Sequence, residues 1–289
     1  MNENLNFPMS VPEQKQDKQP GLESLMNPRP IFENSNSIGS GKLLNKVALI
    51  TGGDSGIGKA VALSYAREGA DIVIVYFDEH EDAEETKKLI EAKGRKCILI
   101  PGDIGDDNFC LNAANKAIKE FNKIDIVVNN AGEQHPQNSI EDITKKQLER
   151  TFKTNIFGMF YMVKATLPYL KEGSTIINTS SITAYKGHET LIDYSSTKGA
   201  IVTFTRSLSL SLESRKIRVN AVAPGPIWTP LIPSSFSASE VGEFGSNTPM
   251  GRLGQPVELA ETYVFLASDD ASFISGETIH VNGGNIING

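Results

Sequence analysis

The chain has 289 residues, of which 39% are hydrophobic, and its formal net charge at neutral pH is −7. This composition supplies a sizeable core, while the acidic balance argues against a surface for nucleic acid or anionic membranes. The two cysteines, Cys97 and Cys110, provide neither a disulfide framework nor a zinc-ligand spacing, so we expect no bound metal. The longest apolar run, residues 72–77, is too short to cross a bilayer, and the start lacks a signal-peptide pattern. We therefore expect a cytoplasmic protein.

Residues 1–41 differ in composition from the rest of the chain. They hold five of the 14 prolines, among Asn, Gln, Ser and Lys, and they show no helical or strand periodicity. Such a segment buries too little apolar surface to offset the entropy lost on ordering, so we predict an extended or disordered N-terminal extension that adds no strand. One domain, residues 42–289, should follow. If the extension lies on that domain, the apolar residues that would anchor it are Leu22, Leu25, Met26, Ile31 and Phe32.

From Lys46 onward, strand-like apolar runs alternate with helical patterns. This alternation predicts an α/β fold with a Rossmann-type, doubly wound parallel sheet of about seven strands and helices on both faces. In such a sheet the ligand binds beyond the carboxyl ends of the strands, at the switch point of the strand order. We expect the strands at 47–50, 72–77, 97–101, 124–128, 175–179, 217–222 and 278–281, and the helices near 57–68, 81–93, 107–121, 144–170, 194–213 and 256–268.

A glycine-rich turn follows the first expected strand. The sequence T-G-G-D-S-G-I-G at 51–58 stands between a buried strand and an amphipathic helix. This arrangement presents backbone N–H groups and the positive end of a helix to a pyrophosphate. Glycine is needed where the turn takes positive φ and where a side chain would block the ligand. The turn therefore predicts a dinucleotide site.

Acidic residues follow the second expected strand. Asp78, Glu79, Glu81 and Asp82 lie there, and no Lys or Arg occurs between Arg67 and Lys87. A carboxylate at this place can bind the adenosine ribose, whereas a 2′-phosphate requires a cation. Alternatively, these acids only form the solvated start of a helix. Both readings predict NAD rather than NADP. The basic residue that could reach round to the site is Lys59, which we expect on the solvent-facing surface.

A tyrosine and a lysine four residues apart begin the helix expected at 194–213. Tyr194 and Lys198 share one helix face, and an ammonium beside a phenol lowers the phenol pKa. The pair could therefore transfer a proton near neutral pH. Asn155 lies within the helical pattern 144–170. Asn is a poor helix former, so its position beside an apolar face indicates that its side chain makes hydrogen bonds.

Residues 42–289 resemble the short-chain dehydrogenase/reductase family in seven segments that occur in the family's order. The family's catalytic serine lies 13 residues before the tyrosine, which selects Ser181 rather than Ser180. The family often has Asp where Tyr76 stands, and its core needs no extension as long as residues 1–41. The matching segments are T-G-G-D-S-G-I-G at 51–58, D-I at 103–104, N-N-A-G at 129–132, Asn155, T-S-S ending at Ser181, Y-S-S-T-K at 194–198 and P-G-P-I-W-T at 224–229.

The resemblance implies an oxidoreductase that moves a hydride between NAD, or NADP, and an alcohol or carbonyl substrate. Tyr194 would exchange the proton, Ser181 would orient the substrate oxygen, and Lys198 would hold the nicotinamide ribose. Asn155 would support a water chain to solvent, and the helices at 144–170 and 194–213 would form a homotetramer. The residues expected around the cofactor are Gly52, Asp54, Ser55, Gly56, Ile57, Gly58, Tyr76, Asp78, Asp103, Ile104, Asn130, Ala131, Gly132, Tyr194, Lys198, Pro224, Gly225, Ile227 and Thr229.

The substrate side is predicted only in outline. Residues 230–250 should form a mobile lid, made partly apolar by Trp228, Phe236 and Phe244. A small alcohol, a sugar or a ketone would each fit, and two other functions stay open. A nucleotide-sensing protein on this fold would usually have lost the catalytic residues, and a sugar-nucleotide epimerase usually has a larger C-terminal part than the roughly 60 residues after Thr229. Further candidates for the pocket wall are Gln134, His135, His188 and Glu189.

Overall fold

The computed structural model describes residues 6–287. Its strands form one seven-stranded sheet, parallel throughout, in the order β3-β2-β1-β4-β5-β6-β7. The predicted Rossmann-type sheet is therefore confirmed, and the strand order switches beside β1, between β1 and β4. The strands are β1 (Val47–Thr51), β2 (Asp71–Tyr76), β3 (Cys97–Pro101), β4 (Ile126–Asn129), β5 (Thr175–Thr179), β6 (Arg218–Pro224) and β7 (Thr278–Val281).

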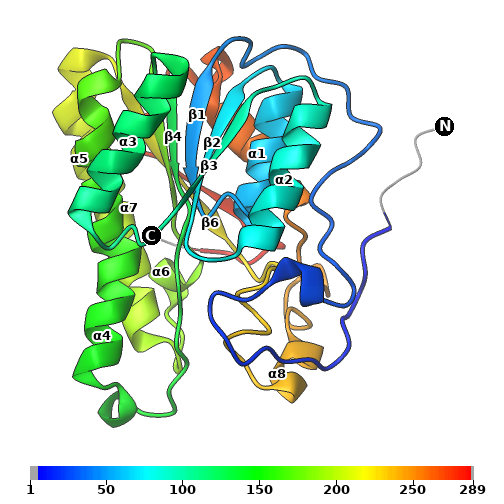
Figure 1. The fold of residues 1–289 in the computed structure, drawn as a ribbon. Helices are drawn as coiled ribbons and strands as arrows, with labels where there is room; N and C mark the ends of the chain where they lie inside the picture. The colour runs from blue at the N-terminus through cyan, green and yellow to red at the C-terminus, as the bar shows by residue number, and fades with distance from the viewer. Residues whose placement is uncertain (1–5, 288–289) are drawn as a thin grey trace.

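Helices cover both faces of the sheet (Figure 1). Helices α1 and α2 lie on one side, and α3, α4, α5 and α7 lie on the other. None of the helices within residues 6–287 combines the length and apolar character that crossing a membrane requires. The helices are α1 (Gly56–Arg67), α2 (His80–Ala92), α3 (Asp107–Phe121), α4 (Lys145–Phe152), α5 (Gly158–Thr166), α6 (Thr183–Lys186), α7 (Ile192–Leu212), α8 (Ala238–Glu243) and α9 (Val257–Ala267).

Each face of the sheet has its own apolar core, because successive strand side chains point to opposite faces. Ile50 of β1 packs in the core that includes Tyr263 of α9. Its neighbour Leu49 packs in the other core, with Met162 of α5. All five residues of β1 are buried, as a central parallel strand requires. This double burial explains why the strands could be recognised as continuous apolar runs.

The helix expected at 144–170 is not continuous. It is divided into α4, one π-helical turn at Lys153–Phe157, and α5. Such a turn inserts one extra residue into the helical hydrogen-bond ladder, and π-turns often occur at functional sites. Asn155 lies in the middle of this turn. The interruption changes the direction in which its side chain leaves the helix, a change that apolar spacing alone does not reveal.

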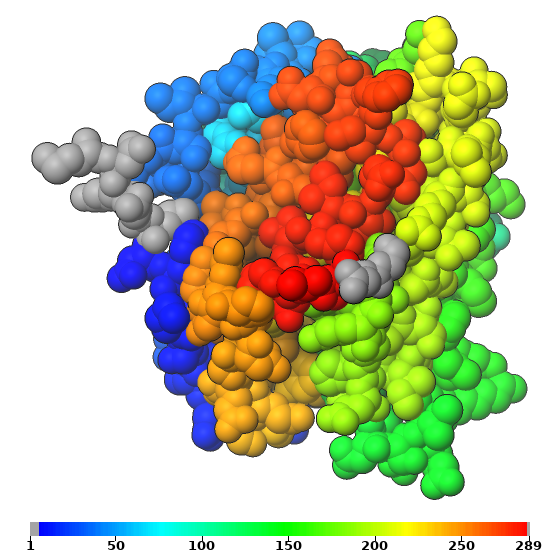
Figure 2. Space-filling model, turned by 180° about the vertical axis from the view of Figure 1, so that it is seen from behind, coloured from blue at the N-terminus to red at the C-terminus, as the bar shows by residue number. Residues whose placement is uncertain are grey.

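The N-terminal extension lies along the side of the domain, against the segment that contains α8 (Figure 2). Apart from a short 3-10 helix at Glu23–Leu25, it has no regular structure within residues 6–41. Its backbone accepts a hydrogen bond from the indole of Trp228 at Pro28, at 2.8 Å, and one from Val257 N–H at Ile31, at 3.0 Å. The extension is therefore part of the folded body rather than a loose tail.

Apolar contacts also hold the extension. Val11 and Met26 are buried in a cluster that includes Trp228, Phe236 and Tyr194. Among the expected anchors, Met26 is buried, Leu22, Ile31 and Phe32 are half-buried, and Leu25 is exposed.

Candidate active site

The glycine turn between β1 and α1 has the geometry that a dinucleotide needs. Gly52 and Gly56 have φ angles of +63° and +52°, which favour glycine. A Cβ on Gly58 would lie 1.8 Å from the carbonyl oxygen of Gly52, so no side chain can be placed there. The absence of side chains at these glycines therefore lets a phosphate group approach the backbone of the turn closely, and the residues present fit the expected cofactor.

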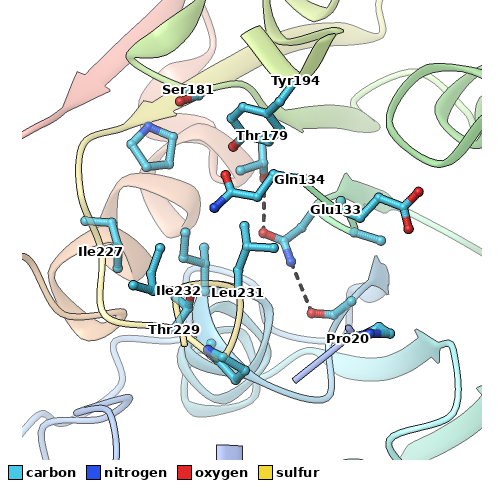
Figure 3. Close-up of a pocket in the computed structure, with 18 of the residues that line it drawn as sticks. Pro20, Glu133, Gln134, Thr179, Ser181, Tyr194, Ile227, Thr229, Leu231 and Ile232 are labelled. Atoms are coloured by element: carbon cyan, nitrogen blue, oxygen red, sulfur yellow. Dashed lines mark hydrogen bonds between the residues drawn. The ribbon is translucent and has the colours of Figure 1, made fainter. Parts of the chain in front are cut away.

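Side chains tie this turn to the neighbouring strand ends. Thr51 Oγ1 accepts hydrogen bonds from the N–H groups of Asn130, at 3.0 Å, and Ala131, at 3.1 Å. The Asn130 amide donates to Gly52 O at 3.1 Å and accepts from Thr179 Oγ1 at 3.3 Å, as the dashed lines in Figure 3 show. The carboxyl ends of β1, β4 and β5 are thus fixed to one another at the switch point, where ligands bind in such sheets.

A cavity of about 470 Å³ opens at these strand ends. Three of the residues predicted for the site, Gly58, Asp78 and Asn155, do not line it, and all the others do. Of the further candidates, Gln134, His188, Phe236 and Phe244 line the cavity, whereas His135, Glu189 and Trp228 do not. Most of the residues predicted for the site therefore line one cavity.

Ser181, Tyr194 and Lys198 meet at one end of the cavity. The Lys198 ammonium lies 5.3 Å from the centre of the Tyr194 ring and donates to the carbonyl oxygen of Thr179 at 2.9 Å. Ser181 Oγ accepts from the N–H and the hydroxyl of Thr183, each at 3.1 Å. The Ser181 hydroxyl hydrogen therefore stays available for an oxygen in the cavity, beside the Tyr194 hydroxyl (Figure 3).

Burial controls the protonation of this pair. It raises the pKa of Tyr194 to about 12, against the effect of the nearby Ser181 hydroxyl, and it lowers the pKa of Lys198 to about 8. The expected lowering of the tyrosine pKa by the ammonium is therefore not found, because burial sets the direction of the shift. At neutral pH Tyr194 therefore holds its proton and is ready to donate it.

Asn155 lies directly behind the cavity wall. Its Oδ1 accepts from Glu133 N–H at 2.9 Å, and its Nδ2 lies 3.0 Å from both Glu133 O and Thr197 Oγ1. A Cβ on Gly132 would be 3.3 Å from Asn155 Oδ1 and 3.6 Å from Lys198 Nζ. Asn155 thus joins the loop after β4 to the helix of Tyr194 and Lys198. These are the side-chain hydrogen bonds that the sequence predicted for Asn155.

The adenosine end of the cavity is acidic. Asp54 and Glu79 both belong to its wall and are almost fully buried. Burial, together with the charge of Glu79, raises the pKa of Asp54 to about 7. Asp78 forms an exposed ion pair with Lys18 of the extension, at 2.6 Å. The extension therefore supplies a cation that local sequence around β2 does not contain.

The prediction for Lys59 was wrong. This residue is fully buried and points away from the cavity, toward Glu23 of the extension at 2.7 Å and Glu85 at 2.9 Å. Glu23 also accepts a hydrogen bond from Gly56 N–H, the first residue of α1, at 2.8 Å. A carboxylate from the extension thus stabilises the start of α1. No motif indicated this contact, because Glu23 and Gly56 are far apart in the chain.

Asp103 borders the cavity, and Arg150 of α4, which sequence analysis missed, holds its carboxylate. Arg150 donates to Asp103 Oδ2 at 2.6 Å and to Glu133 Oε2 at 3.2 Å. Burial raises the pKa of Asp103, but hydrogen bonds from Arg150 and the Gly105 N–H outweigh it and leave the pKa below its usual value. Asp103 is therefore ionised and fixed in place. The sequence does not show this, because Arg150 is close to Asp103 only in the folded chain.

Comparisons with known proteins agree with this geometry. The family model described as enoyl-(acyl carrier protein) reductase matches residues 52–285. An uncharacterised oxidoreductase of Bacillus subtilis is 63% identical over 280 residues, covering 97% of this chain and 98% of that protein. Glucose and ribitol dehydrogenase of Daucus carota is 51% identical over 284 residues, covering 96% and 98%. NADPH-dependent aldehyde reductase 1 of Arabidopsis thaliana is 48% identical over 287 residues, covering 97% and 100%.

Solved structures show the same likeness. A short-chain dehydrogenase of Burkholderia cenocepacia in complex with NADP is 30% identical, with a TM-score of 0.79 over 84% of this chain and 98% of that one. A 3-ketoacyl-(acyl-carrier-protein) reductase of Brucella melitensis complexed with NADH is 36% identical, with a TM-score of 0.76 over 84% and 98%. The resemblance found in the sequence motifs is confirmed. The chain belongs to the short-chain dehydrogenase/reductase family of NAD(P)-dependent oxidoreductases.

Proposed function

We propose that this protein reduces the carbonyl group of a small polar substrate, with Tyr194 as the proton donor. One observation carries the proposal. Ser181, Tyr194 and Lys198 lie together at one end of the cavity, and the glycine turn lies at the other end. A nicotinamide bound between these two ends would supply the hydride. The names of the relatives, a glucose and ribitol dehydrogenase and an aldehyde reductase, favour a sugar, a polyol or an aldehyde.

Each catalytic side chain has a role that its surroundings support. Tyr194 keeps its proton at neutral pH and would give it to the substrate oxygen as the carbonyl is reduced. Ser181 would donate its free hydroxyl hydrogen to the same oxygen and so orient the carbonyl. Lys198 would donate to the ribose hydroxyls of the cofactor, and its charge would stabilise the phenolate left on Tyr194. Asn155 would help to return a proton from solvent through its links to Glu133 and Thr197.

A panel of aldehydes, ketones and aldoses tests the reaction class. The purified protein is mixed with NADH or NADPH and each compound, and the nicotinamide absorbance is followed. We expect steady loss of absorbance with at least one carbonyl compound, and formation of the reduced cofactor when the corresponding alcohol is supplied with NAD or NADP. Binding of cofactor without turnover of any compound would instead support a nucleotide sensor.

The preferred cofactor is proposed to be NAD. Glu79, and Asp54 above its pKa of about 7, would face a 2′-phosphate with like charge, and Lys18 of the extension is already paired with Asp78. We expect NADH to bind at least about thirtyfold more tightly than NADPH, or about 2 kcal/mol. Calorimetric titration with both cofactors measures this ratio. Tighter binding of NADPH that is lost in Lys18→Ala would contradict the preference and assign the 2′-phosphate to Lys18.

The protein is further proposed to be a cytoplasmic homotetramer. Its two cysteines are free and buried, which suits a reducing compartment. The helices expected at the subunit contacts carry exposed apolar side chains, at Leu148, Phe157, Phe160 and Leu210. Such residues on neighbouring helices favour association between subunits.

A further inference from the structure

The side-chain amide of Gln134 projects into the cavity and is free. Gln134 is 4% exposed, and the hydrogen bonds that it makes within residues 6–287 all come from its backbone. In Figure 3 its amide lies between Ser181 and Tyr194 on one side and Leu231 and Ile232 on the other. Polar side chains this deeply buried are normally hydrogen-bonded, and an amide offers both donors and an acceptor. The position therefore calls for a partner that enters with the substrate.

The backbone of Gln134 is held by one side chain of the extension. Gln19 Nε2 donates to Gln134 O at 2.9 Å, and Gln134 N–H donates to Gln19 Oε1 at 2.9 Å. The preceding residue, Glu133, is held in the same way by the amide of Asn155. Two consecutive residues thus have their backbone fixed by paired amides. The backbone from which the Gln134 side chain extends is therefore fixed before a substrate arrives, as a binding group requires.

Two polar side chains next to the catalytic pair, Thr179 and Ser180, are already engaged. Thr179 Oγ1 lies 2.8 Å from Tyr263 OH, and Ser180 Oγ donates to Lys198 O at 2.9 Å. Ser181 and Tyr194 are directed to the reacting oxygen. The Gln134 amide is therefore available for a second oxygen of the substrate.

We propose that Gln134 binds an oxygen on the carbon next to the reacting one, and that Gln19 is a positioning residue for this contact. The substrate would then be an α-hydroxy aldehyde or ketone, or a vicinal diol in the reverse direction. The inference rests on the proposed function, because it assumes that the reacting oxygen lies between Ser181 and Tyr194. A hydroxyl group donates and accepts, as an amide does, whereas a plain aldehyde has no second oxygen for the Gln134 amide to bind.

Steady-state reduction of glyceraldehyde and propanal, which differ in their hydroxyl groups, tests the contact. Wild type should prefer glyceraldehyde. Gln134→Leu keeps a side chain of similar size but removes the amide. We expect it to lower kcat/KM for glyceraldehyde about 10- to 100-fold, while kcat/KM for propanal stays within about twofold. Unchanged NADH affinity and melting temperature would show that the variant is folded.

The role of Gln19 has a matched control within the extension. Gln19→Leu should lower the ratio of the two kcat/KM values about threefold to tenfold and leave the NADH affinity unchanged. Among residues 6–287, the amide of Gln14 bonds to Pro12 and Asn27 alone, both within the extension itself. Gln14→Leu should therefore leave the substrate ratio as it is in wild type. A general loss of stability would lower kcat/KM for both substrates equally and would leave the ratio of the two values unchanged.

The remaining outcomes separate this inference from the proposed function. Equal losses on both substrates in Gln134→Leu, or no loss on either, would overturn the role of Gln134. The same holds for a wild type that reduces propanal or other carbonyls but shows no preference for glyceraldehyde. In each of these cases the protein is still a carbonyl reductase. A wild type that reduces no compound of the panel contradicts the proposed function itself.

Discussion

Asp54 shows how one side chain of the glycine turn can link pH to cofactor binding. It is 4% exposed, and burial beside Glu79 raises its pKa to about 7. Below this pH the carboxyl group is neutral, and above it a negative charge appears at the turn that would receive the cofactor phosphates. The family motif alone would suggest a permanently charged Asp at this position. Its protonation depends on burial and on Glu79, and the motif shows neither.

We predict that NADH affinity falls as the pH rises through about 7 and that Asp54→Asn removes this fall. At about pH 8 the variant should bind NADH roughly fivefold more tightly than wild type, because one like-charge interaction of about 1 kcal/mol is removed. Calorimetric titrations at about pH 6 and 8 measure the change. Parallel pH dependence in wild type and Asp54→Asn would assign the effect to another group.

The same raised pKa has a consequence for stability, with a definite sign. Between the ordinary value of 3.8 and about 7, the native protein keeps a proton on Asp54 that the unfolded chain has lost. The free energy of unfolding should therefore decrease as the pH rises through this window. Asp54→Asn should reduce that decrease, which denaturant unfolding at several pH values can detect.

Lys59 and Arg150 mark the limit of sequence reasoning at the scale of single residues. Glycines, the Tyr194–Lys198 pair and Ser181 were located because motifs have a fixed spacing within one segment. The partners of Lys59 and Arg150 come from distant segments, at Glu23 and Asp103. From the sequence, a lysine beside the glycine turn is expected to face solvent. The folded chain instead buries Lys59 in an ion pair with Glu23.

At the scale of elements, the extension is connected to the cofactor-binding helix by a buried ion network. Lys59 of α1 and Glu23 are both fully buried, and Lys59 also lies 4.0 Å from the centre of the Phe32 ring. Arg29 of the extension pairs with Glu85 of α2 at 2.8 Å.

The alignment with the Bacillus subtilis relative covers 97% of this chain and so includes most of the extension, whereas the two solved structures cover 84%.

Glu23→Ala should lower the free energy of unfolding by about 3 kcal/mol, because it leaves the Lys59 ammonium buried with only Glu85 as its partner. Denaturant unfolding measures the loss. The exposed pair of Lys18 and Asp78 provides the control, and Lys18→Ala should change stability by no more than about 0.5 kcal/mol. Equal effects of the two substitutions would show that the buried network has no special importance for stability.

Elements were predictable where their apolar pattern was long enough. Strands 97–101, 175–179 and 278–281 agree with the structure in both bounds, and the central one of these, β5, is buried along its whole length. Helices α6 and α8 were missed, since four and six residues are too few for a helical period to show. Whether the extension docks stayed open in the sequence, although one of the expected anchors, Met26, is buried. Docking also depends on backbone hydrogen bonds and buried charges, which leave no periodic pattern in the sequence.

At the scale of the whole molecule, the exposed apolar residues on α4, α5 and α7 predict an assembly. Phe160 of α5 is 52% exposed, and Leu111 of α3 is 49% exposed outside the proposed contact helices. We expect wild type to have the mass of a tetramer by light scattering and Phe160→Glu to have a smaller mass. Leu111→Glu is the matched control and should leave the mass unchanged. A monomeric wild type would contradict the proposed assembly.

The most direct test of the proposed function compares wild type with Tyr194→Phe in the reduction of the best carbonyl substrate by NADH or NADPH. Loss of the proton donor should lower the rate at least about 100-fold, while cofactor affinity stays within about twofold of wild type. Tyr185→Phe removes a tyrosine hydroxyl that does not line the cavity and should keep the wild-type rate. Turnover by Tyr194→Phe at near the wild-type rate would contradict the assignment of Tyr194 as the catalytic acid.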